Sequence, residues 1–125
     1  MLIIAHRGAS GHEPENTLRA IRSALDMGVD AVEVDVHSIE NELIVIHDRW
    51  LHRTTNGQGQ VRYHNLTSLR ELDAGLGERI PTLWEVMEVI SGKCDLNIEL
   101  KSIEDLVPLL RMIDLAVEQL GFSLD

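Results

Sequence analysis

Short apolar runs alternate with helical patterns along this chain, and the alternation limits the folds that it can adopt. Runs with the length and composition of strands cover 2–5, 31–36 and 96–100. Apolar residues at helical spacing predict helices over 14–28, 81–90 and 104–120. This order predicts parallel strands joined by right-handed crossovers, which is an α/β fold. The first run is apolar throughout, so we expect it to be buried on both faces.

Two further features separate the second strand from the second helix. The β-branched run 42–48, "ELIVIHD", follows closely after Val36 and is expected to form a hairpin with it. Residues 48–79 hold four glycines and a Thr-Thr-Asn-Gly turn, which indicates an insertion of loops with one short helix at 68–72. Pro14 is expected in the first turn of the first helix. Thr82 and Glu85 predict a capping box on the second.

Charged and titratable side chains stand where the apolar runs end. Because the carboxyl ends of parallel strands meet at one edge of a sheet, we expect these side chains to converge. They are His6, Arg7, Glu33, Asp35, His47, Asp48, Glu99 and Lys101.

Three carboxylates in this set favour a metal site. Glu33 and Asp35 are two residues apart and share one face of a strand, and Glu99 lies on the adjacent strand. Three like charges repel strongly unless a cation neutralises them. An all-oxygen ligand set suits Mg²⁺ or Ca²⁺ better than zinc. The alternative is that these residues form the solvated face of an exposed sheet.

The remaining residues of this edge indicate chemistry on a phosphate ester. His6 and His47 are candidate proton carriers, because imidazole titrates near neutral pH. Arg7 and Lys101 would bind phosphate oxygens, although Lys101 could instead be an ordinary ion-pair partner of Glu99. Together with a metal, these groups predict metal-assisted phosphoester cleavage.

The other titratable residues leave more than one interpretation open. Asp48 could orient His47 or cap a turn. Four histidines, of which His37 is expected to point to the opposite face of its strand from Asp35, are interpreted as bystanders. They are His12, His37, His52 and His64.

Composition excludes several classes of partner. The formal net charge of −10 argues against nucleic acid and against anionic membrane surfaces. No apolar run approaches the ~18 residues of a membrane span, so no stable membrane insertion is expected. Cys94 is the single cysteine and reads as a small core residue that can form no internal disulfide. "MLIIAH" lacks the basic start of a signal peptide, and we expect a cytoplasmic protein.

Six blocks of this sequence, in order, resemble the glycerophosphodiester phosphodiesterases. They are "AHRG", "PENT", "EVDV", "HDRWLHRTT", "IPTL" and "NIELK". The resemblance implies a partial (β/α)8 TIM barrel in which 1–125 form the amino-terminal part, about three βα units with a β-hairpin and a small insertion at 48–79. It implies hydrolysis of a small glycerophosphodiester to glycerol 3-phosphate and an alcohol, within lipid and glycerol metabolism.

The resemblance also implies roles for single residues. His6 and His47 would be the acid–base pair, and Arg7 and Lys101 would contact the phosphate. The divalent metal, Mg²⁺ or Ca²⁺, would be held by Glu33, Asp35 and Glu99. In related enzymes a neighbouring substrate hydroxyl attacks first and forms a cyclic phosphate that water opens.

The sequence departs from the family pattern in two places. The hairpin tip reads "SIENEL" in place of the usual threonine and Asp-Gly turn, which leaves the turn type open. A barrel needs at least about 200 residues, so we expect a truncated chain that self-associates through open sheet edges. The alternatives are a catalytically weak or inactive half-barrel that acts as a self-associating module, and a lysophospholipase D-like or sphingomyelinase D-like phosphodiesterase.

Overall fold

The computed structural model of the protein describes residues 1–123, which form four strands and four α-helices. The strands are β1 (Ile4–His6), β2 (Ala31–Ile39), β3 (Glu42–Val45) and β4 (Asp95–Leu100). The α-helices are α1 (Leu18–Asp26), α2 (Leu66–Arg70), α3 (Leu83–Ile90) and α4 (Leu106–Leu120). Two 3₁₀ helices, η1 (Val61–Tyr63) and η2 (Ile103–Asp105), lie between them.

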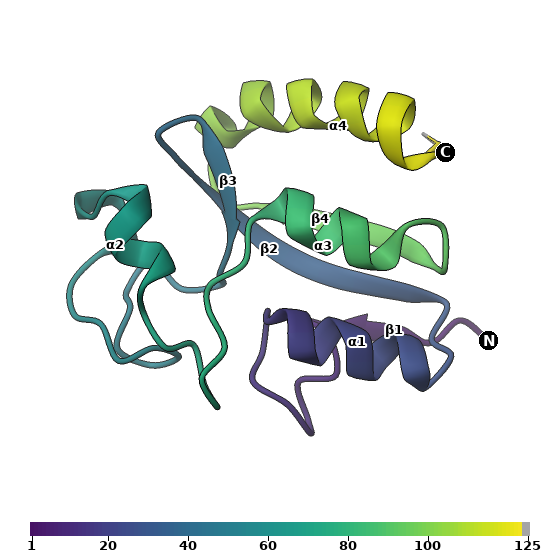
Figure 1. Ribbon diagram of the computed structural model, residues 1–125, viewed down its shortest axis with the longest axis horizontal. Coiled ribbons are helices and arrows are strands. Elements are labelled where there is room, and N and C mark those ends of the chain that lie inside the picture. The colour runs from purple at the N-terminus through teal and green to yellow at the C-terminus, as the bar shows by residue number, and fades with distance from the viewer. Residues whose placement is uncertain (124–125) are drawn as a thin grey trace.

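The sheet is mixed and is built around β2. Strands β1 and β4 pair with β2 in parallel, so that Ala31 lies opposite Ile4 on one side and Asp95 on the other. Strand β3 pairs with β2 antiparallel, which confirms the predicted hairpin. Figure 1 shows α1, α3 and α4 in a row on one face of the sheet, with α2 beyond the hairpin. The α/β prediction is therefore confirmed.

Alternation along β2 separates the core from the chemistry. Val32, Val34 and Val36 are fully buried and pack against the helices in the main core. Burying each of these side chains contributes about 2 kcal/mol of transfer free energy. The residues between them, Glu33 and Asp35, therefore lie on the opposite face, which the helices do not cover.

From Leu43 to Val45, strand β3 is buried on both faces, because alternate residues pack in two different cores. Leu43 and Val45 belong to the main core between sheet and helices. Ile44, together with Ile46 just after the strand, belongs to a second core that includes Leu51 and Leu69 of the insertion. The insertion is thus a packed unit on the hairpin, and its short helix α2 begins two residues before the predicted start.

The hairpin tip is a two-residue turn. Glu40 and Asn41 have φ values of 53° and 64°, and Ile39 pairs with Glu42 across the turn. Left-handed φ at both central positions defines a type I′ turn, whose twist matches that of the flanking strands. This settles the turn type that the sequence leaves open.

Strand β1 contradicts its prediction. The first run is not buried on both faces, because Leu2, Ile3 and Ile4 are 76%, 56% and 49% exposed. Over residues 1–123, β1 has a neighbouring strand on one side alone, and β4 likewise. Both outer edges of the sheet are therefore open.

The start of α1 differs most from its prediction. Helix α1 begins at Leu18 rather than near Pro14, because the Thr17 side chain caps it by accepting a hydrogen bond from Ala20 N. The capping box of Thr82 and Glu85 on α3 is confirmed. Residues 122–123 are not in a strand, and the rest of the predicted strand start "FSLD" lies outside the described residues.

Candidate functional site

The chain leaves β1 in a sharp turn that places Arg7 at the edge of the sheet. Arg7 and Gly8 both have left-handed backbone, with φ of 59° and 77°. The Arg7 amide is held by the Glu33 carbonyl at 2.8 Å. A Cβ on Gly8 would lie 2.9 Å from the backbone of Ala20, so a glycine is required there. Arg7 is not a glycine, so its left-handed backbone carries strain of the kind often found at functional sites.

Three carboxylates converge on the face of the sheet that the helices do not cover. In the parallel register Asp35 lies opposite Glu99, and Glu33 is two residues before Asp35. One oxygen atom of each lies within 4.8 Å of those of the other two. Asp35 is fully buried, which is not what an ordinary solvated strand face gives, whereas the Glu99 side chain is 56% exposed. The predicted convergence is therefore present.

The electrostatics of the cluster move the pKa values of the two carboxyls of β2 in opposite directions. Burial, together with repulsion from Asp35, raises the pKa of Glu33 to about 7. Burial also raises the pKa of Asp35, but the hydrogen bond from Asn16 and the nearby Lys101 ammonium outweigh it and leave this pKa below its ordinary value. Asp35 Oδ1 accepts no hydrogen bond of good geometry within residues 1–123, although Lys101 Nζ is 3.0 Å away. A carboxylate cluster with such an atom is a fitting ligand set for a hard divalent cation.

Two cationic side chains flank Asp35, and each comes just after a strand that pairs with β2. Arg7 Nε is 3.5 Å from Asp35 Oδ2, and Lys101 Nζ is 3.0 Å from Asp35 Oδ1. Lys101 also lies 3.4 Å from Glu99 Oε1, so the ion pair that the sequence left open is present, but the contact to Asp35 is shorter. Both cations are mostly buried at this edge.

The two candidate histidines have different surroundings. His6 Nε2 lies 3.7 Å from Glu33 Oε1, and its side chain is 62% exposed. His47 Nδ1 donates to Asp48 Oδ1 at 2.7 Å. This contact gives Asp48 the orienting position that the sequence could not assign, and it leaves His47 Nε2 free to act on another molecule.

Arg53, Glu15 and Asn16 are residues of this site that the sequence interpretation missed. Arg53 donates to Asp48 at 2.7 Å and to Glu15 at 2.8 Å, and Glu15 lies 3.4 Å from Arg7. An unbroken series of polar contacts therefore joins His47 to Arg7, and through Asp35 to Lys101. The signal for these residues lies in the "PENT" and "RTT" segments, although the helical pattern alone predicts a helix start at "PENT".

Asn16 holds the buried carboxylate from the same loop. Its side-chain amide donates to Asp35 Oδ2 at 3.1 Å, and the residue is 3% exposed. Its φ of 58° is one that asparagine tolerates better than most residues. The loop before α1 thus stabilises the charged form of Asp35.

The predicted orientation of His37 is wrong. Residues 35 and 37 are two apart in one regular strand, so their side chains lie on the same face. His37 donates its Nε2–H to the His47 carbonyl at 3.2 Å and lines a hollow together with Lys101. Burial lowers its pKa, which favours a neutral ring.

Over residues 1–123, no helix combines the length and the apolar character that crossing a bilayer requires.

Comparisons with known proteins identify relatives of this chain. The model of the glycerophosphoryl diester phosphodiesterase family matches residues 6–120. The glycerophosphodiester phosphodiesterase of Caldanaerobacter subterraneus subsp. tengcongensis is 48% identical over 110 residues, which cover 81% of this chain and 45% of that protein.

Solved structures give the same relationship. An Oleispira antarctica phosphodiesterase in complex with the product sn-glycerol-3-phosphate has a TM-score of 0.84 and 38% identity, covering 96% of this chain and 53% of that one. The glycerophosphodiester phosphodiesterase of Agrobacterium tumefaciens has a TM-score of 0.80 and 38% identity, covering 94% and 55%. The chain spans about half the length of these relatives. This chain belongs to the glycerophosphoryl diester phosphodiesterase family.

Proposed function

We propose that this chain hydrolyses glycerophosphodiesters to glycerol 3-phosphate and an alcohol. The observation that carries the proposal is the meeting of Glu33, Asp35 and Glu99 within 4.8 Å, with cations and imidazoles at the same edge. Family membership supports the reaction class.

The two cations are proposed to bind the phosphate. Arg7 and Lys101 are held near Asp35, with separations of 3.5 Å and 3.0 Å, so their donors are positioned before a substrate arrives. A guanidinium and an ammonium on two sides of one phosphate would stabilise the charge that develops during cleavage. Their fixed placement lowers the cost of reorganisation.

The histidines are proposed as the acid–base pair. Because the Nδ1–H of His47 is directed at Asp48, its Nε2 can accept the proton of the attacking oxygen. His6 then gives a proton to the leaving alkoxide, so that the protons lost and gained balance.

We propose that Glu33, Asp35 and Glu99 hold a divalent cation, Mg²⁺ or Ca²⁺. When bound, such an ion polarises the phosphoryl oxygens as a Lewis acid. The oxygen-only ligands and the raised pKa of Glu33, which a nearby cation would lower, support this assignment.

A coupled assay for glycerol 3-phosphate tests the proposal. The chain is incubated with glycerophosphocholine and Mg²⁺ or Ca²⁺. Chelation should stop product release, and His47→Ala or His6→Ala should reduce it by about 100-fold or more. His12→Ala, in the exposed loop after Arg7, is the matched control and should keep full activity. A folded, metal-binding chain that releases no product would refute the assignment.

We further propose that β1, β2 and β4 belong to a partial (β/α)8 barrel, with residues 48–79 as its insertion. Support comes from their parallel order with helices on one face, and from relatives of which the chain spans about half. The open outer edges of β1 and β4 favour association with a second copy of the chain. A single cysteine is compatible with the cytoplasmic location that we propose.

A further inference from the structure

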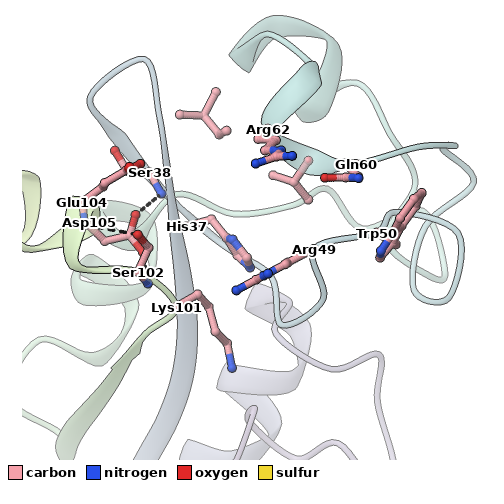
Figure 2. A pocket seen from close by; sticks show the side chains of 12 residues that line it. His37, Ser38, Arg49, Trp50, Gln60, Arg62, Lys101, Ser102, Glu104 and Asp105 are labelled. Atoms are coloured by element: carbon pink, nitrogen blue, oxygen red, sulfur yellow. Dashed lines mark hydrogen bonds between the residues drawn. The ribbon is translucent and has the colours of Figure 1, made fainter.

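A hollow of about 420 Å³ lies between the hairpin and the insertion. His37 and Lys101 form one side of it, and Arg49, Trp50, Gln60 and Arg62 come from the insertion. Figure 2 shows Arg49 extending toward His37 and Lys101, with Arg62 approaching from the insertion above them. A volume of this size accommodates a ring-sized polar ligand.

The hollow is continuous with the candidate site. Lys101 lines it, and the same ammonium lies 3.0 Å from the buried Asp35 carboxylate. His37 stands on the same face of β2 as Asp35, two residues closer to the hairpin. A diester whose phosphate contacts Lys101 can therefore extend one of its two halves into the hollow.

The charges of the hollow favour an anion. Arg49 and Arg62 are exposed, and neither has a carboxylate within 4.0 Å among residues 1–123. Arg62 is held over the Tyr63 ring, with Cζ 4.8 Å from its centroid. Two such guanidinium groups on one hollow stand out in a chain of net charge −10.

The acidic residues of the lining do not cancel these two charges. Asp105 is buried, and its carboxylate accepts the backbone N–H groups of Ser38 and Ser102 at 2.8 Å and 3.1 Å. Figure 2 shows Asp105 and Glu104 beside Ser38, across β2 from the arginines.

We propose that this hollow binds the alcohol half of the diester and selects alcohols that carry a second anionic group, such as a phosphorylated polyol, over cationic ones such as choline. The proposal rests on the proposed function for the identity of the diester. Guanidinium forks bind phosphate oxygens in pairs and repel a quaternary ammonium.

The test uses inositol 4-phosphate as a free anionic alcohol, with choline as the cationic comparison. Both are titrated into the chain in metal-free buffer, and the indole N–H signal of Trp50 is followed by NMR. Trp84 packs against the main core and serves as the internal reference. Inositol 4-phosphate should shift the Trp50 signal to saturation, and choline should not.

Two double variants with equal charge change show whether Arg49 and Arg62 themselves bind the anion. Arg49→Gln with Arg62→Gln should weaken the binding of inositol 4-phosphate by about tenfold or more. Arg22→Gln with Arg111→Gln removes two exposed arginines on α1 and α4 and should change the affinity by less than about twofold. No shift of Trp50, an equal loss in both double variants, or an equal response to choline would overturn the proposal. The probes contain no phosphodiester and the buffer contains no metal. The binding result is therefore independent of whether the chain is active in the product assay.

Discussion

Replacement of Arg53 by glutamine tests whether the polar network around His47 is a stabilising unit. Arg53 makes two hydrogen bonds to Asp48, at 2.7 Å and 2.9 Å, and two to Glu15, at 2.8 Å and 2.9 Å. The side chains of Arg53, Asp48 and Glu15 are 45%, 23% and 16% exposed. Partly exposed pairs contribute up to about 1 kcal/mol each, so the variant should lose about 1–2 kcal/mol at pH 7.

The loss should depend on pH in a defined direction. The hydrogen bonds from Arg53, and then the contact with His47, hold the pKa of Asp48 well below its usual range. A lowered pKa gives stability that is present above the ordinary value of about 4 and lost as the pH falls below it. The difference between wild type and variant should therefore be full at pH 7 and should shrink below about pH 4.

Urea unfolding at several pH values measures this difference. At 125 residues, 1–2 kcal/mol corresponds to a drop of about 4–8 °C in melting temperature, which gives a second measurement. Arg79→Gln is the matched control, since it removes an exposed arginine that has no ion pair among residues 1–123. An equal loss in both variants, or a loss that does not change with pH, would refute the reasoning.

Three further variants test other parts of the structure. Glu99→Gln should weaken Mg²⁺ or Ca²⁺ binding by about tenfold or more in calorimetry, whereas Asp95→Asn on the same strand should not; equal affinities would exclude Glu99 as a ligand. Thr82→Ala should lower the free energy of unfolding by about 1 kcal/mol, because it removes the cap of α3, and an unchanged value would argue against that cap. Ile4→Lys should reduce self-association in sedimentation velocity, because a charge on an open edge strand opposes pairing; a wild-type monomer at all concentrations would contradict the association.

The convergence of Glu33, Asp35 and Glu99 could be predicted from sequence, because two simple rules decide it. Side chains alternate along a strand, and parallel strands end at a common edge. The same alternation places His37 on the face of Asp35, so this orientation also follows from the sequence. The extent of β2 could not be predicted, because the polar residues at its end become strand only by pairing with β3.

Arg53 could not be placed from spacing. It lies 38 residues from Glu15, and the contact depends on the path of an insertion that has little periodicity. Asn16 presents a similar case, because its left-handed backbone and its bond to Asp35 depend on the loop that precedes α1. Residues on regular strands follow from pattern, whereas those on loops follow from packing.

The two faces of β3 have a consequence for the modularity of this region. Because Ile44 and Val45 point into different cores, a one-residue shift of the strand would exchange the contents of both. The insertion therefore cannot be transplanted between relatives by cutting at its ends, even though its sequence resembles a detachable loop. A graft that alters the arginine-lined hollow must carry the whole segment from Ile39 to Ile80, both of which pack in the second core.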